Sequence, residues 1–190
     1  MSEGIRFPLA QAQAVAERII KDLEPYCHRI QIAGSIRRGK SEVGDVEILY
    51  VPRIEEGDGV DLFGIPDGKE RNLVDEELTE WITEGFLRKR RNVKGSEMWG
   101  KENKLGLDVQ SGIPVDFFSS PPQYWFNRLV CRTGPYDQNK AIATKALEMG
   151  LTWNVYGAGF TNLQTGEVTP MGSEKEVFAT VGLPCPEFQR

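Results

Sequence analysis

Two acids, Asp45 and Glu47, lie one residue apart in the apolar segment DVEILYV, and they are the residues best suited to chemistry. In a β-strand, side chains two residues apart point to the same face, with their Cα atoms about 6.6 Å apart. Carboxylates at this spacing repel each other and resist full ionisation unless a cation joins them. The pair therefore predicts a hard divalent metal bound by oxygen atoms. The alternative is an exposed strand face on which both acids meet water.

A third acid could complete a metal site. Asp116 lies between Val115 and Phe117 in the apolar segment IPVDFF. Two metal ions about 3.5 to 4 Å apart activate an attacking oxygen and stabilise a leaving phosphate. We therefore expect two divalent metal ions held by three catalytic, metal-binding residues: Asp45, Glu47 and Asp116.

A glycine-containing turn precedes these acids. Gly34 and Ser35 end the segment RIQIAGS, two arginines follow, and Gly44 directly precedes Asp45. Glycine lets a phosphate approach the backbone closely, and a helix that begins at this turn would direct the positive end of its dipole there. An anion-binding turn beside a cation site is the arrangement that triphosphate chemistry needs.

The apolar spacing predicts the elements that position these residues. We expect, in order, a helix from Pro8 to Leu23, strands over 29–34 and 45–51, a loop over 55–69, a helix over 72–86 capped by Asn72, and strands over 105–110 and 113–118. The last two strands form a hairpin, because Ser111 and Gly112 between them are typical of a turn.

Composition changes at the segment SSPPQYW, which predicts a boundary between one domain over 1–120 and a smaller one over 121–190. The second is expected to contain a helix over 136–149 closed by Gly150, and short strands from LTWNVYGAGF onward. A capping box in SEKEVF begins a last short helix. The predicted fold class is α+β, a mixed sheet with helices followed by a small α/β subdomain.

Charge and cysteine usage limit the classes of function. The net charge of −5 argues against strong sequence-independent binding to nucleic acid, because such binding depends on lysine and arginine. The basic run RKRRNVK over 88–94 is a local exception, and a solvated surface is its alternative explanation. The three cysteines form no CxxC motif, and no apolar run approaches the roughly 20 residues of a membrane span. We expect a cytosolic monomer with reduced thiols and no membrane partner.

The order of these motifs resembles a known superfamily. The nucleotidyltransferase pattern consists of glycine and serine, nine further residues, and then acid, apolar, acid, apolar, and this chain matches it. The segment GSIRRG followed by GD is also similar to the family X DNA polymerases, the relatives of polymerase beta. The segments TGPYDQNKAIATKALEMGLTWNVYG and SEKEVF resemble parts of that family's C-terminal region. The resemblance extends from about Ile5 to the end. It implies a nucleotidyltransferase palm followed by a thumb-like, nucleotide-binding subdomain.

The resemblance also implies roles for the matched residues. It makes the three acids the ligands of two Mg²⁺ ions, which Mn²⁺ could replace, and it makes Asp116 the residue that helps a primer 3′-hydroxyl to lose its proton. The turn that binds the β- and γ-phosphates is matched by Gly34, Ser35, Arg38 and Gly44. Arg6 resembles an additional triphosphate-binding arginine, and its alternative is a surface arginine near the terminus.

Further matches lie in the second part of the chain. Thr133 and Gly134 match a turn that lies against the sugar and often contains a cis peptide. Asn139 matches the residue that contacts the minor-groove edge of the incoming base, and Lys140 lies beside it. The positions where the palm approaches the primer backbone, and thus the DNA, are matched by Arg90, Arg91 and Lys94.

The chain also departs from the family pattern. Glu47 stands where family X polymerases usually have aspartate, and Cys131 with Arg132 replaces an aromatic pair that helps to reject ribonucleotides. Ala143 replaces an arginine that reaches the template strand, and Pro114 replaces a basic or polar residue before the third acid. No lyase or helix-hairpin-helix domain is expected, so the chain is similar to the minimal viral members of the family. Its binding to DNA should be weak and salt-sensitive.

Three functions follow as alternatives. The first is a small template-directed DNA polymerase that uses deoxynucleoside triphosphates to fill short gaps in gapped or primed DNA. The second is transfer of a nucleotide without a template, or to RNA, a protein or a small molecule. The third is a module that binds nucleotides or DNA ends without chemistry.

Overall fold

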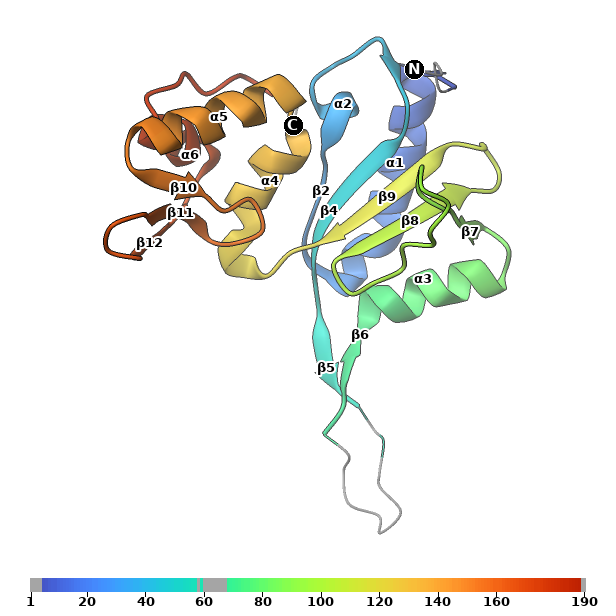
Figure 1. Cartoon of the computed structure of the whole chain (residues 1–190). Helices are drawn as coiled ribbons and strands as arrows, with labels where there is room; N and C mark the ends of the chain where they lie inside the picture. The colour runs from blue at the N-terminus through green and yellow to red at the C-terminus, as the bar shows by residue number, and fades with distance from the viewer. Residues whose placement is uncertain (1–4, 58, 60–67, 189–190) are drawn as a thin grey trace.

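The computed structural model describes residues 5–57, 59 and 68–188, which form two lobes (Figure 1). The N-terminal lobe is built on a five-stranded mixed sheet, and the C-terminal lobe on a three-stranded antiparallel sheet. The α+β class expected from the sequence is confirmed. A two-stranded arm, β5 (Ile54–Glu56) and β6 (Glu70–Asn72), extends below the N-terminal lobe in Figure 1.

The five-stranded sheet has the order β2-β4-β9-β8-β7. Its central pair, β4 and β9, is parallel, and all the other pairs are antiparallel. The strands are β2 (Cys27–Ile32), β4 (Val46–Pro52), β9 (Pro114–Ser119), β8 (Asn103–Asp108) and β7 (Leu87–Lys89). The expected hairpin of the last two long strands is confirmed by the antiparallel pairing of β8 with β9.

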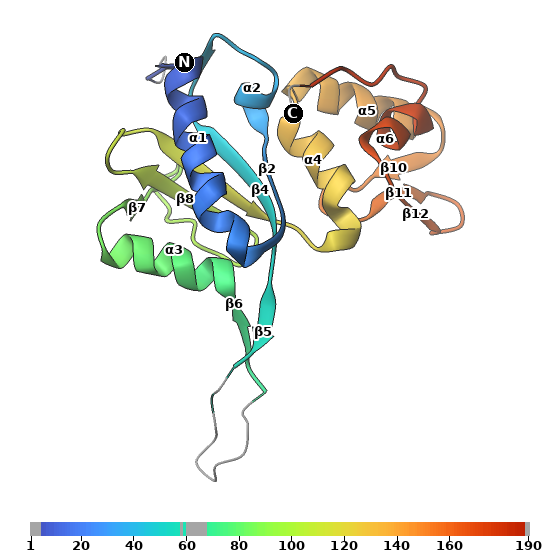
Figure 2. The same cartoon turned by 180° about the vertical axis from the view of Figure 1, so that it is seen from behind.

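One face of this sheet is covered by two long helices, as Figure 2 shows from behind. These are α1 (Leu9–Leu23) and α3 (Leu73–Thr83), whose apolar sides join the strand residues Val46, Ile48 and Tyr50 in the main core. Burying such aliphatic and aromatic side chains contributes about 25 cal/mol per Å² of apolar surface. The Asn72 side chain accepts a hydrogen bond from the Asp75 N–H and caps α3 as expected.

The opposite face of β4 and β9 changes character along the strands. Its first positions carry Glu47 and Asp116, and its later positions carry Leu49, Val51 and Phe118. The apolar positions pack against the C-terminal lobe, where they meet α4 (Trp125–Thr133). The two lobes are therefore joined by a continuation of the same surface that holds the acids.

The C-terminal lobe contains three helices and a small sheet, and it has its own core. Its elements are the 3₁₀ turn η2 (Pro122–Tyr124), α4, α5 (Tyr136–Glu148), β10 (Leu151–Trp153), β11 (Gly159–Asn162), β12 (Val168–Pro170) and α6 (Glu174–Thr180). Ser173 caps α6 by accepting a hydrogen bond from the Glu176 N–H, as the sequence predicted. The Glu176 carboxylate bonds the Gly172 N–H rather than completing the expected box.

Short elements complete the N-terminal lobe. They are β1 (Phe7–Pro8), which pairs with β3 (Glu42–Val43), the 3₁₀ turn η1 (Glu24–Tyr26), and the one-turn helix α2 (Gly34–Arg37). The helix start expected at the Gly34-Ser35 turn is therefore present. Within the described residues, no helix is long and apolar enough to cross a membrane.

Two sequence-based expectations need correction, and one helix was not predicted. Asp45 lies immediately before β4 and not inside it. The expected loop over 55–69 is paired at its base as β5 and β6, and its residues 58 and 60–67 lie outside the described part of the chain. The helix α4 was not expected, because its buried side includes the polar Asn127 and Arg128, which break the apolar pattern.

Candidate functional site

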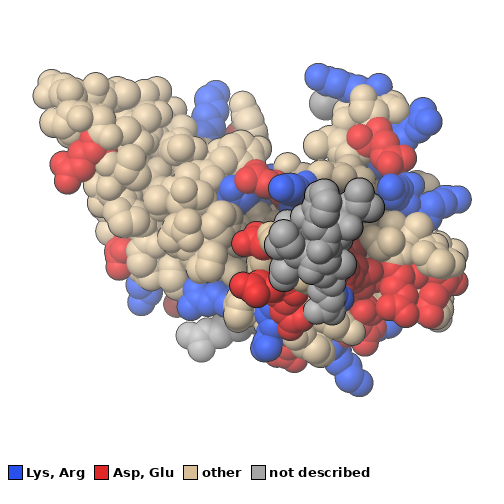
Figure 3. Space-filling view, turned by 90° about the horizontal axis from the view of Figure 1, so that it is seen from below, with Lys and Arg blue, Asp and Glu red and all other residues tan. Residues whose placement is uncertain are grey.

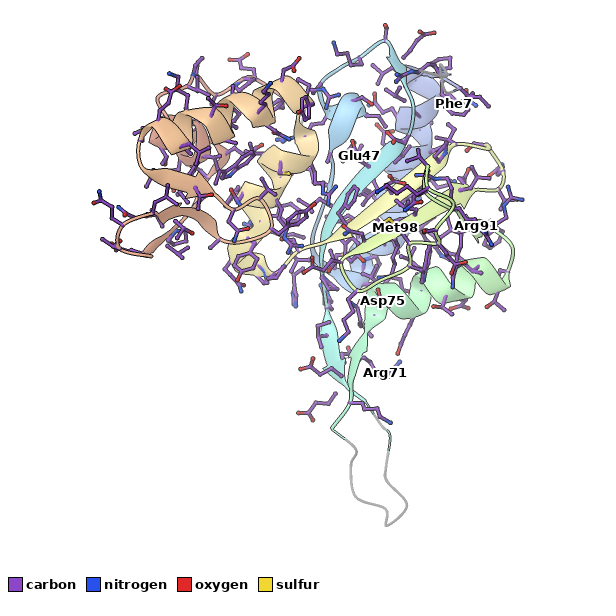
Figure 4. The ribbon with its side chains drawn as sticks, in the orientation of Figure 1. Phe7, Glu47, Arg71, Asp75, Arg91 and Met98 are labelled. Carbon is purple, nitrogen blue, oxygen red and sulfur yellow. The ribbon has the colours of Figure 1, made fainter. Side chains whose placement is uncertain are left out.

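The three acids meet on one face of the central strand pair. In the parallel register of β4 and β9, Glu47 lies directly opposite Asp116, and Asp45 lies two residues before Glu47. Glu47 lies beside α2 at the beginning of β4 in Figure 4. The arrangement expected from the sequence, with Asp116 beside the other two acids, is therefore present.

Burial raises the pKa of all three carboxyl groups, and repulsion by neighbouring acids adds to the shift for Glu47 and Asp116. Burial, with repulsion by Asp45 and Asp116, raises the pKa of Glu47 to about 8. Burial also raises the pKa of Asp116 to about 6, although the charge of Arg90 opposes the shift. The pKa of Asp45 is raised for the same main reason, and nearby arginines again oppose the shift. Three such acids on one face have a strong electrostatic demand for cations.

An arginine partly meets that demand. The Arg90 Nη2 donates to Asp116 Oδ1 at 2.6 Å, and the Asp116 side chain is only 14% exposed. Arg90 follows β7 directly in the chain. It was expected at the primer backbone, and in this structure it binds the third acid.

Gly34 is in direct contact with Glu47. Its φ is +62°, in the left-handed region that favours glycine. A Cβ at this position would overlap the Glu47 carboxylate. Glycine is therefore required here for two reasons, its backbone conformation and the close approach of an acid.

A pocket of about 600 Å³ opens beside the acids at the beginning of β4 and β9. Six residues that the sequence predicted for phosphate and metal binding line it: Arg6, Ser35, Arg38, Gly44, Asp45 and Glu47. Leu107, Gly112 and Pro114 form part of its wall. Its cations and its turn provide a place for an anion next to the carboxylates.

A larger groove of about 1530 Å³ lies elsewhere, between α3 and the β5–β6 arm. Seen from below in Figure 3, acidic side chains are concentrated in this region of the molecule. None of the residues predicted for the site lines this groove. The larger size of this groove is therefore no reason to place the chemistry there.

The turn at Thr133 and Gly134 lies against α2. Arg37 Nη1 donates to Thr133 Oγ1 at 2.9 Å, and Arg38 Nη1 donates to the Thr133 carbonyl oxygen. Arg37 also forms a two-bond ion pair with Glu174, at 2.6 and 2.7 Å. The peptide bond between Gly134 and Pro135 is cis. The C-terminal lobe is thus attached to the helix that lines the pocket.

Unpartnered polar atoms gather at the same junction. Asn139 Nδ2 donates to the Cys131 carbonyl oxygen at 2.7 Å, whereas Asn139 Oδ1 is buried without a hydrogen-bond partner among the described residues. Arg38 Nε is likewise buried without a hydrogen-bond partner among the described residues. Both side chains lie within 4 Å of where a Gly134 side chain would begin. Buried polar atoms are normally bonded, so these two are exceptions, and Asn139 and Gly134 do not line the pocket beside the acids.

The residues present suit a hard divalent metal by donor type. Three carboxylates on one face, with pKa values raised mainly by burial, are oxygen ligands in need of positive charge. In the conformation described for 5–57, 59 and 68–188, no three acidic, histidine or cysteine side chains are gathered as a ready metal cage. Asp116 is held by Arg90, so the acid would have to share or exchange this partner on binding a metal.

The remaining predicted residues lie apart from the acids. Lys94 and Lys140 are exposed, and Arg91 is exposed in an isolated bridge to Glu97. Figure 4 shows Arg91 across the sheet from Glu47. Sequence reasoning did not assign Arg37 or Glu174, whose partners are far away in the chain, and it noted Arg132 only as a departure from a family pattern.

Comparison with known proteins adds no assignment. No protein-family model matches the chain, and no curated protein matches it. The functional argument therefore depends on the geometry of the acids, the pocket and the junction between the lobes.

Proposed function

We propose that this protein is a nucleotidyltransferase that adds deoxynucleotides to the 3′-hydroxyl of a DNA primer, with the N-terminal lobe as its palm. The observation that carries the proposal is the parallel register that sets Glu47 beside Asp116. Asp45 and a pocket containing Arg38 lie next to this pair. The motif resemblance to family X polymerases supports the same conclusion.

The pocket residues would bind the triphosphate. Arg6 and Arg38 can pair with phosphate oxygens, and Ser35 with the backbone at Gly44 can donate further hydrogen bonds. The leaving pyrophosphate would then lie at the beginning of β4. Gly134 and Asn139 would face the nucleoside, where the buried Asn139 Oδ1 has no partner among the described residues.

The acids would serve the reacting centre. The primer oxygen forms a bond to the α-phosphorus, the bond from this phosphorus to the bridging oxygen breaks, and pyrophosphate leaves with the electron pair. Asp116 would accept the proton of the attacking hydroxyl at a carboxylate oxygen. Asp45, Glu47 and Asp116 would hold the metal, and Mg²⁺, when bound, lowers the pKa of the hydroxyl and neutralises the leaving group.

Primer extension tests this proposal. The wild-type protein with Mg²⁺ and four deoxynucleoside triphosphates should extend a gapped primer with the templated nucleotide. Asp116→Ala should reduce extension by at least about a hundredfold, because it removes both a metal ligand and the proton acceptor. Asp22→Ala, at an exposed position of α1, is the matched control. Absence of transfer to any primer, or unchanged transfer by Asp116→Ala, would exclude the proposal.

A second candidate is transfer of ribonucleotides, or transfer to a non-DNA acceptor. The observation that favours ribonucleotide transfer is at Cys131 and Arg132, which replace an aromatic pair that helps family X polymerases to reject ribonucleotides, and Arg132 lies against the Phe118 ring instead. A panel of all eight ribo- and deoxynucleotides on DNA, RNA and primer-free controls separates the candidates. Strict dependence on a DNA template would eliminate this one.

A further inference from the structure

Arg132 is held in a fixed position at the junction of the lobes. It lies in the last turn of α4, and its guanidinium carbon is 3.6 Å from the centre of the Phe118 ring. Its Nη2 donates to Asn103 Oδ1 at 3.2 Å. Asn103 and Phe118 are register partners on β8 and β9, so the guanidinium lies over these two strands. Stacking and hydrogen bonding together pre-organise an arginine for binding.

The charge of Arg132 reaches the acids without being neutralised by them. Its proximity opposes the upward pKa shifts of Glu47 and Asp116. Within the described residues, however, Arg132 forms no ion pair, whereas Arg90 is bound to Asp116 and Arg37 to Glu174. A fixed guanidinium beside a reaction centre, with unused in-plane donors, is suited to a phosphate oxygen.

The position of Arg132 indicates which phosphate it meets. The pocket for the triphosphate opens at Gly44 and Pro114, before the acids in β4 and β9. Arg132 lies at Phe118, beyond Asp116 on the same strand and face. The acids therefore lie between the two. In an in-line displacement the attacking and leaving oxygens are on opposite sides of the phosphorus, so Arg132 is on the side of the acceptor.

We propose that Arg132 binds the phosphodiester next to the attacking hydroxyl, and that it thereby selects a nucleic-acid strand as the acceptor. A protein side chain or a small alcohol has no phosphate at this position and would leave the guanidinium without its partner. The inference rests on the proposed nucleotidyl transfer. It adds a substrate-contacting residue from the C-terminal lobe to the acids of the N-terminal lobe.

The test combines a protein variant with a chemically altered acceptor. Binding of a labelled recessed primer is measured by fluorescence anisotropy without metal or nucleotide, for a normal primer and for one with an uncharged methylphosphonate at its last linkage. Arg132→Ala should weaken binding of the normal primer roughly tenfold, as expected for one charged hydrogen bond. The methylphosphonate should weaken wild-type binding by a similar factor and have little further effect on the variant.

Two other variants separate this contact from a structural effect. Arg132→Lys keeps the charge and should recover part of the affinity. Arg29→Ala is the matched control, because Arg29 also lies over aromatic rings of α4, those of Trp125 and Phe126, but its charge does not shift the pKa of the acids. Its affinity for each of the two primers should equal that of the wild type for the same primer.

Two results would overturn the inference. One is that Arg132→Ala weakens binding of the normal primer and of the methylphosphonate primer by the same factor. The other is a rise in the KM for the nucleotide with no change in primer binding. Failure of the proposed function would look different, since the wild type would then transfer nucleotides to no acceptor, whatever its primer affinity.

Discussion

Glu47 and Leu49 are two residues apart on β4 and point to the same face, yet their surroundings differ completely. Glu47 is a half-buried acid whose pKa is raised to about 8, and Leu49 is fully buried in the contact between the lobes. The strand therefore uses one face for two purposes. The exposed-strand alternative for the acids does not hold, because none of the three is exposed.

The raised pKa values predict a pH-dependent stability for the metal-free protein. The pKa of Glu47 rises from 4.5 to about 8 on folding, and that of Asp116 from 3.8 to about 6. Between these values the folded state binds more protons than the unfolded state, so the free energy of unfolding should fall as pH rises from about 5 to about 8. Urea unfolding across this range checks the sign.

Glu47→Gln should remove most of this dependence. The amide is close in size and carries no charge at any of these pH values, so the variant should be more stable than the wild type near pH 8. It should also lose nucleotide transfer. Glu148→Gln, at an exposed position, should leave the pH profile unchanged. Identical profiles for the wild type and Glu47→Gln would show that the acid is solvated.

Gly34→Ala should harm both folding and activity. The new side chain has to adopt φ near +62° and displace the Glu47 carboxylate. The backbone alone costs about 1 kcal/mol. Gly150→Ala is the matched control, because its φ is +73° and nothing lies within 4 Å of the added carbon. We expect similar backbone costs for both, and a loss of transfer of at least tenfold for Gly34→Ala alone.

At the scale of elements, one helical turn connects the lobes. Arg37 of α2 and Arg38 directly after it contact the end of α4, and Arg37 also contacts the beginning of α6. Arg37 is 6% exposed and Glu174 is 19% exposed, so water screens their ion pair poorly. The same short helix lines the pocket with Ser35. The position of the C-terminal lobe is thus coupled to the site.

Glu174→Gln tests this coupling. It leaves Arg37 buried with half of its charge-assisted bonding, which should cost about 1 to 3 kcal/mol of unfolding free energy. Because α2 lines the pocket, the variant should also bind the nucleotide more weakly. Lys145→Gln breaks a pair whose side chains are 50% and 55% exposed and should cost under about 0.5 kcal/mol. Equal stability of the two variants would contradict a structural role for α2.

The elements with regular apolar spacing could be predicted from the sequence, and α1, α3, β4, β8, β9 and α5 are present as expected. The acids could be predicted because Asp45 and Glu47 are two residues apart at the beginning of one strand. The partner of Asp116 could not, since Arg90 follows a three-residue strand far away in the chain. Likewise α4 was missed because its buried Asn127 donates to the Asn154 and Gly157 carbonyls and accepts from Trp153, an arrangement that only the folded lobe provides.

At the scale of the molecule, the net charge of −5 opposes binding of a polyanion, and few arginines are placed to overcome it. If Arg132 and one other cation are the main phosphate contacts, the logarithm of the association constant should fall with the logarithm of salt with a slope of about −1.5 to −2. Fourfold more salt would then weaken primer binding roughly tenfold. Anisotropy titrations at several salt concentrations measure this slope.

Arg132→Ala should reduce the slope by about one, since each phosphate contact releases about one counterion. Lys140→Ala, at an exposed position outside the pocket, serves for comparison and should change it less. A steep slope near −5 that is independent of Arg132 would mean that an unrecognised basic surface controls binding.

The parallel pairing of β4 with β9 has a consequence for synthesis and refolding. The two strands are distant in the chain, and everything between them, including α3 and the arm, has to be made before they can meet. A growing chain therefore cannot assemble the three acids until β9 has left the ribosome. Recovery of activity after denaturation should accordingly follow the formation of this long-range pairing, which makes turnover a reporter of the slowest topological step in folding.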